Sequence, residues 1–305
     1  MKRLLIVATL ALAGVVPSAQ TQIVADVRAL IANADLAGAE RVANEYRSRN
    51  GNTPDALVAL SWVGRGALAA GDNDNASRIA SQTHTLVLDG LKSRALDADK
   101  VLPIALGAAI ETEAKAMAAT GQRAGAVSYL REQGAKYRTT SIYGRLQKNL
   151  HLLSLEGQPA PAFTAKETLG APPASTKGKP VLLFFWAHWC PDCKAQAPII
   201  ADLQQRYKNQ GLVVVGPTRR YGYVARGAEA GPAEELTYIE EVRRQYYGAI
   251  DMYVPVSNDD VLAWGMDATP TLVLVDRDGK VALYHPGQMT REELEPRIQA
   301  LVRRP

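Results

Sequence analysis

Cys190 and Cys193 are the only cysteines in this chain of 305 residues, and Pro191 and Asp192 separate them. The apolar run at 180–187 before them predicts a buried strand, and the apolar spacing at 194–203 after them predicts a helix. At such a junction the first sulfur lies among unpaired N–H groups at a helix N-terminus, where the helix dipole favours the thiolate. The second cysteine follows one turn later, close enough to open or close a small disulfide ring.

A C-x-x-C pair can also belong to a structural zinc site or form a permanent structural disulfide. A structural zinc site needs about four ligands, and His188 would supply only a third. A permanent disulfide of this separation would close a loop too short to constrain the unfolded chain much. We therefore interpret the pair as a redox-active dithiol, with no metal and no cofactor.

Four stretches of the chain resemble the thioredoxin superfamily, in the order expected for it. The segment 184–194 resembles its active-site segment. Residues 157–163, with the turn at 177–180, resemble the lead-in of the TlpA/ResA-like and redoxin branches. The segment 268–276 resembles the cis-proline loop and its following strand, and 278–281 resembles the hairpin turn that comes next. The resemblance covers 157–305 and implies an α/β thioredoxin fold, a mixed sheet flanked by helices.

The resemblance also implies roles for the motif residues. Cys190 would be the exposed nucleophile, and Cys193 the sheltered resolving thiol that breaks the mixed disulfide. A cis bond before Pro270 would bring the backbone of Thr269 within reach of an extended substrate. Asp192 places a negative charge beside the sulfurs, which disfavours the thiolate and indicates a reductase.

Other residues around the motif are expected to pack or to touch a substrate. Trp186 and Trp189 are expected mainly to pack around the motif. The predicted substrate-binding set consists of Thr269, Trp189, Pro191, Asp192, Arg219 and Tyr221. Arg219 and Tyr221 belong to a long loop at 218–232, which starts at the same end of the sheet as Cys190; a solvated surface loop is the alternative.

Two positions depart from the family pattern. Phe184 stands where thioredoxins carry a buried aspartate, and Gln196 stands where TlpA/ResA-like reductases often carry a glutamate. Both carboxylates are proposed in the family to move the proton of the resolving cysteine. Proton transfer here would use water or another group.

The two halves of the chain follow different patterns. Residues 20–156 show helical periodicity, and similar turns at 34–39, 71–76 and 121–126 resemble degenerate tetratricopeptide-like (TPR-like) helical hairpins. Such an all-α domain would serve either as a spacer or dimer surface, or as a surface that recruits a protein partner. Gly157–Pro161 marks a domain boundary, and 157–305 then alternates strands with helices. Strands are expected at 181–186, 212–215, 271–275 and 280–284, and helices at 190–210, at 233–247 and from about 290.

Residues 1–19 have the pattern of a cleaved signal peptide. Lys2 and Arg3 precede 13 mostly apolar residues, a run too short to be a stable membrane span. We expect export to a periplasm. The formal net charge of +4 includes these two basic residues and is too small to indicate a nucleic-acid partner.

The sequence as a whole predicts an exported thiol–disulfide oxidoreductase that reduces protein disulfides and is recharged by an upstream thiol donor. A redox-dependent protein-binding adaptor is the non-enzymatic alternative. A thiol peroxidase is a second enzymatic alternative, although Ala187 stands where that resemblance calls for threonine.

Overall fold

The computed structural model describes residues 19–173 and 175–303. The predicted signal peptide lies outside the described residues except for Ala19, where the first helix begins. The chain divides into two compact units, residues 1–109 and 110–305, and the division falls within helix α5. The second unit therefore begins earlier than the predicted boundary at 157, and it includes the last helices of the helical region.

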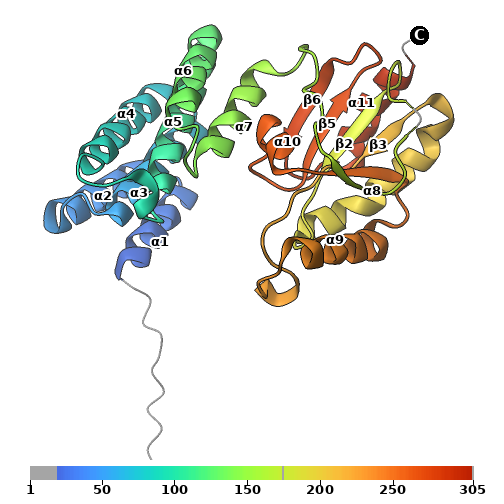
Figure 1. The fold of residues 1–305 in the computed structure, drawn as a ribbon. Coiled ribbons are helices and arrows are strands. Elements are labelled where there is room, and N and C mark those ends of the chain that lie inside the picture. The colour runs from blue at the N-terminus through green and yellow to red at the C-terminus, as the bar shows by residue number, and fades with distance from the viewer. Residues whose placement is uncertain (1–18, 174, 304–305) are drawn as a thin grey trace, which may run out of the picture. The chain divides into compact units, whose positions relative to one another are not determined.

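The helical region up to residue 156 contains no strand among its described residues, as predicted (Figure 1). Each of the three turns predicted from sequence joins two consecutive helices, and its last four residues already belong to the second helix. Its helices are α1 (Ala19–Ala32), α2 (Leu36–Asn50), α3 (Pro54–Ala69), α4 (Asn73–Gly90), α5 (Leu102–Ala119), α6 (Arg123–Lys136) and α7 (Tyr143–Ser154), with a 3₁₀ turn at Leu96–Ala98.

Small residues allow the helices of the first unit to approach closely. Ala39, Ala43 and Ala59 are fully buried in a cluster with apolar residues of α1, α3 and α4. A Cβ atom added to Gly66 of α3 would lie 2.9 Å from a methyl carbon of Leu36. The alanine-rich pattern thus produces close helix packing, because larger side chains would hold the helix axes apart.

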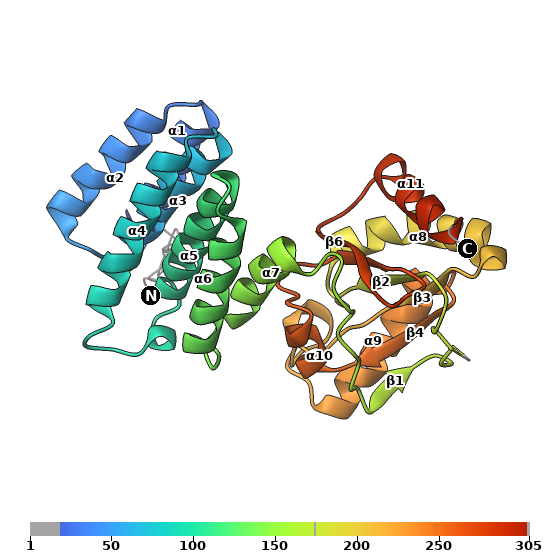
Figure 2. The same ribbon diagram turned by 90° about the horizontal axis from the view of Figure 1, so that it is seen from above.

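A six-stranded sheet follows in the second unit, with the order β1-β4-β3-β2-β5-β6 (Figure 2). Strands β2, β3 and β4 run parallel, and β1, β5 and β6 each run antiparallel to their neighbours. The strands are β1 (Glu167–Leu169), β2 (Val181–Phe185), β3 (Val213–Val215), β4 (Met252–Val256), β5 (Thr271–Val275) and β6 (Val281–Pro286). Both central strands, β2 and β5, are buried along their whole length, as their apolar runs predict.

Side chains alternate between two layers on either side of this sheet. Leu182 and Phe184 of β2 join a core formed with α8 (Pro191–Tyr207), α9 (Pro232–Tyr247) and α11 (Arg291–Val302). Val181, Leu183 and Phe185 join a second core with Trp264, which follows the short helix α10 (Asn258–Ala263), and with Leu155 after α7. This alternation places α8, which carries the cysteines, on one face of the sheet.

Helix α7 packs against α10 and β6 within the second unit. The Nδ1 atom of His151 lies 3.0 Å from the carbonyl oxygen of Trp264, and its ring makes an edge contact with Tyr284 at 5.7 Å. Lys148 pairs with Asp267 at 3.1 Å. A Cβ added to Gly265 would lie 2.6 Å from the backbone of Gln147, so this site requires glycine for close approach. Independent folding of 157–305 stays a prediction.

Candidate active site

Cys190 and Cys193 lie where β2 gives way to α8, as their flanking sequence predicts. Cys190 is the N-cap of α8, Pro191 occupies its first turn, and the Cys193 N–H donates to the Cys190 sulfur over 3.0 Å. The two sulfurs form a disulfide, with the Cα atoms 5.3 Å apart. Pro191 has no N–H to leave unsatisfied at this position. The helix terminus thus directs a backbone donor at Cys190, which stabilises a thiolate there.

The exposure expected for Cys190 is wrong in this disulfide form. Cys190 is 1% exposed and Cys193 is 0% exposed, so both sulfurs lie beneath the surface. Trp189 is instead the exposed residue of the motif, at 46%. Trp186 is fully buried and donates through Nε1 to the carbonyl oxygen of Gly216, which agrees with a packing role. Trp189 is only partly covered, and its ring contacts Tyr221.

A groove of about 310 Å³ lies beside the motif and brings together four of the predicted substrate residues: Trp189, Arg219, Tyr221 and Thr269. The Thr269–Pro270 peptide bond is cis, as the resemblance implies. Trp189 and Tyr221 meet edge to face at 5.5 Å, and the Arg219 guanidinium lies 4.9 Å from the centre of the Tyr221 ring. Pro191 and Asp192 are exposed but do not line this groove.

Phe184 and Gln196, which replace the family's carboxylates, both have structural partners. Phe184 is buried and packs edge to face against Tyr247 at 5.7 Å. The Gln196 amide accepts from the Met289 N–H at 2.9 Å and donates to the Met289 carbonyl oxygen at 3.1 Å. Gln196 therefore fastens α8 to the loop before α11, a task that needs one donor and one acceptor.

Sequence reasoning missed a buried polar cluster directly before the cysteines. His188 and Glu235 are each 1% exposed, and His188 Nε2 lies 3.1 Å from Glu235 Oε1. Glu235 also accepts from the N–H groups of Tyr221 at 2.5 Å and Gly222 at 2.9 Å. Edge contacts of 5.3 to 5.5 Å join the His188 ring to Tyr221, Tyr223 and Tyr238. This cluster fixes the loop that supplies Arg219 and Tyr221 to the groove.

Burial shifts the pKa of three side chains in and around this cluster. Desolvation lowers the pKa of His188, although the hydrogen bond and charge of Glu235 act in the opposite direction. Desolvation also raises the pKa of Tyr221 and that of Tyr223. A neutral imidazole donates from Nε2 to Glu235, which leaves Nδ1 as an acceptor. That buried Nδ1 atom has no hydrogen-bond partner among the described residues.

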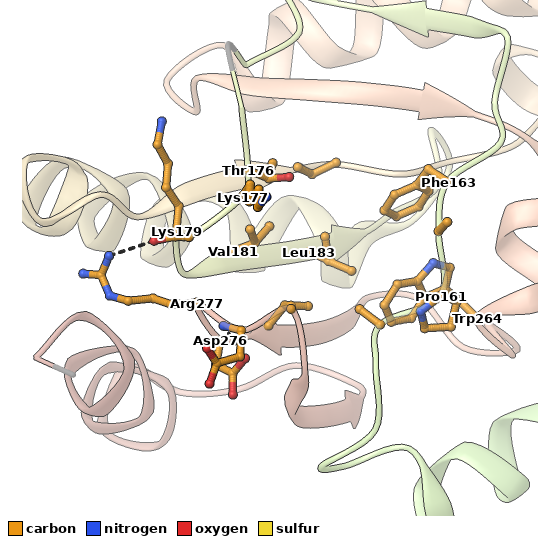
Figure 3. A pocket seen from close by; sticks show the side chains of 17 residues that line it. Pro161, Phe163, Thr176, Lys177, Lys179, Val181, Leu183, Trp264, Asp276 and Arg277 are labelled. Atoms are coloured by element: carbon orange, nitrogen blue, oxygen red, sulfur yellow. Dashed lines mark hydrogen bonds between the residues drawn. The ribbon is translucent and has the colours of Figure 1, made fainter. Parts of the chain in front are cut away.

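Figure 3 shows the lining of a larger cavity, of about 560 Å³. Its walls include Val181 and Leu183, which face the side of the sheet opposite α8, together with Phe163 and Trp264. Arg277 reaches across one end and donates to the carbonyl oxygen of Gly178 at 3.0 Å. No residue of the C-x-x-C motif or the cis-proline loop lines this cavity, so it is not part of the dithiol site.

No group of three or more His, Cys, Asp or Glu side chains that could hold a metal ion occurs among residues 19–173 and 175–303.

The sheet order, the disulfide at the N-terminus of α8 and the cis-proline loop beside it define a thioredoxin fold with a C-x-x-C dithiol, as predicted. Residues 173–301 match the family model of the thioredoxin-like domain.

Proteins named for thiol–disulfide chemistry or for a thioredoxin-like fold match a similar share of the chain. The thiol-disulfide oxidoreductase ResA of Bacillus thuringiensis subsp. konkukian is 27% identical over 125 residues, which cover 41% of this chain and 65% of ResA. The thioredoxin-like protein YneN of Bacillus subtilis is 28% identical over 151 residues, 47% of this chain and 78% of YneN. A crystal structure of a putative thiol:disulfide interchange protein DsbE from Chlorobium tepidum is 26% identical, covers 48% of this chain and 97% of its own, and superposes with a TM-score of 0.36.

Proposed function

We propose that this chain is an exported thiol–disulfide oxidoreductase that reduces disulfides in client proteins. The observation that carries the proposal is the Cys190–Cys193 disulfide at the N-terminus of α8, with Trp189 and Thr269 lining one groove beside it. The similarity to ResA supports the same chemistry, and the stretch that matches the thioredoxin-like domain, 173–301, includes the motif.

The proposed reaction exchanges one disulfide for another. In the reduced protein, the Cys190 thiolate attacks a client disulfide, and one client sulfur leaves as a thiolate that takes up a proton. The Cys193 thiol then loses its proton and attacks the Cys190 sulfur of the mixed disulfide. The second client sulfur leaves as a thiol, and the protein is left with the disulfide seen here. A donor thiol supplies the two electrons that restore the dithiol.

The proposed direction, toward reduction of the client, follows from the charges at the helix start. Strongly oxidising pairs have a stabilised reduced form, in which the nucleophilic cysteine is a thiolate. Asp192 adds a negative charge in the first turn of α8 and opposes that thiolate. We expect a reduction potential closer to about −270 mV than to about −120 mV, measured by equilibration with glutathione. Asp192→His is expected to raise the potential.

Export to a periplasm is proposed from the sequence pattern of residues 1–19. Within the described parts of the chain, no helix combines the length and the apolar character needed to cross a bilayer. An exported protein with a reducing dithiol needs an upstream electron donor, because periplasmic cysteines are kept oxidised.

A role in recruiting a protein partner is proposed for the helical region. Its helices α1 to α4 are joined by short turns, and residues of all four pack in one cluster, which supports the interpretation as TPR-like hairpins. The alternative, a spacer or dimer surface, predicts that removing these helices leaves activity on clients unchanged.

Two assays distinguish the proposed function from its alternatives. The full chain, reduced beforehand, should cleave the disulfides of insulin in the presence of a thiol donor, and should consume hydrogen peroxide no faster than the variant Cys190→Ala. An adaptor would neither cleave insulin disulfides nor consume peroxide faster than Cys190→Ala does. A thiol peroxidase would consume peroxide in a manner that depends on Cys190.

A further inference from the structure

One wall of the active-site groove comes from the connection between α6 and α7 and from the first turn of α7. Arg138, Thr140, Ser141, Tyr143 and Gly144 line the groove together with Trp189 and Thr269. These residues belong to the same compact unit as the cysteines, and they lie outside the stretch 173–301 that matches the thioredoxin-like domain. The wall is therefore an addition to the matched domain.

Short-range contacts hold this wall in place. Helix α7 begins at Tyr143, directly after the connection, and its later residues are fixed by the Lys148–Asp267 pair and by His151 against Trp264. Gln147 and Gly265 also approach closely, since a Cβ added to Gly265 would lie 2.6 Å from the backbone of Gln147. The wall is preorganised, so a bound chain would not have to order it.

The charges lining the groove are unbalanced. Asp267 is the one carboxylate among its lining residues, and Lys148 already neutralises it. Arg138 is exposed and makes no ion pair with any residue of the described ranges. Arg219 donates to Asn258 at 2.8 Å, while its buried Nε atom has no hydrogen-bond partner in the part of the chain that the structure describes. Two guanidinium groups thus face the groove without a carboxylate of their own.

The groove also has the surfaces that an extended peptide uses. Trp189 and Tyr221 offer aromatic area, and Leu262 and Met266 offer apolar area. Guanidinium groups bind carboxylates through paired hydrogen bonds as well as by charge. Aromatic and arginine side chains together are the residue types that dominate binding at protein interfaces.

We propose that this groove selects client segments that carry an acidic side chain close to the reacting cysteine, with Arg138 and Arg219 as the groups that recognise it. The proposal rests on the proposed oxidoreductase function and names its substrate class. It assigns Arg138, from the helical region, a part in choosing the client.

Binding of unreactive peptides tests this selection without turnover. The probe is a fluorescently labelled peptide of about eight residues in which serine replaces the client cysteine, made with glutamates or with lysines flanking the serine. Polarisation with the oxidised full chain should give a dissociation constant about fivefold lower for the glutamate peptide, since one attraction replaces one repulsion at a partly exposed site. The preference should shrink as salt is raised to about 1 M, where the screening length is about 3 Å.

Arg138→Glu should abolish or reverse the preference. Arg131→Glu is the matched control, because Arg131 is also exposed, lies on α6 and does not line the groove. Equal affinity of the wild type for both peptides, or an unchanged preference in Arg138→Glu, would overturn the proposal. Turnover is measured as the rate of disulfide reduction. The substrates are the same two peptides with a disulfide in place of the serine, and hydroxyethyl disulfide as a neutral small substrate. A wild type that prefers the glutamate peptide yet reduces none of these disulfides would retain the binding site and refute the proposed reductase.

Discussion

Replacing Glu235 tests whether the buried cluster next to the cysteines holds the site together. The change Glu235→Gln keeps the size of the side chain but exchanges one carboxylate oxygen for an NH₂ group. The remaining oxygen can still accept from Tyr221 and His188, whereas the NH₂ group would face the Gly222 N–H, which now donates to the second oxygen. The Gly222 N–H then lacks an acceptor, and the new NH₂ group, which is also a donor, points toward it.

The expected cost is about 2 kcal/mol in the free energy of unfolding, within the range of about 1–3 kcal/mol for leaving a buried polar group unsatisfied. Urea unfolding of the oxidised protein measures it as a lower midpoint at an unchanged slope. Glu234→Gln is the matched control, because Glu234 is the exposed neighbour in the same first turn of α9. It should stay within about 0.5 kcal/mol of the wild type. Equal midpoints for the two variants would refute the cluster's structural role.

Three further predictions concern other parts of the second unit. Gln196→Glu loses the amide donor to a backbone carbonyl, so we expect about 1–3 kcal/mol of destabilisation in urea and no faster resolution of a mixed disulfide in stopped flow. Burial lowers the pKa of His188 and of His151, so the unfolded state binds more protons below about pH 6.5. Unfolding free energy should therefore fall as pH drops below that value, by at most about 1.4 kcal/mol per pH unit for each histidine, and stop falling once both are protonated in the folded state; a flat profile between pH 7 and 5 would contradict this. A fragment 157–305 should fold by circular dichroism but melt below a fragment 110–305, because it lacks α7; equal melting temperatures would show that α7 adds nothing.

Elements with a strong apolar pattern were predictable, and those positioned by tertiary contacts were not. Local sequence predicts β2 and β5, because each is a continuous run of apolar residues. It also predicts the helix after Cys190, because apolar residues recur there at helical spacing. Strand β4 was missed, since Pro255 within Met252–Val256 argues against a strand. Strand β1 has only three residues and pairs with β4 alone.

The same distinction applies to the site. The cysteine pair and the cis-proline loop carry their signal in adjacent residues. Glu235 looks like an ordinary acidic residue in the first turn of a helix, and only the returning loop at 218–231 buries it. Arg138 lies about fifty residues before the motif, so only the packing of α7 reveals that it lines the groove.

Trapping of mixed disulfides tests the central claim, that Cys190 attacks and Cys193 resolves. Each single variant, Cys193→Ala and Cys190→Ala, would be reduced, freed of reductant and mixed with a disulfide-bonded client such as insulin, and the adducts would be counted by intact mass before and after addition of dithiothreitol. Cys193→Ala should accumulate an adduct that dithiothreitol releases, because the attacking thiolate remains and the resolving thiol is gone. Cys190→Ala should form almost none. Equal adduct formation by the two variants, or more by Cys190→Ala, would contradict the account.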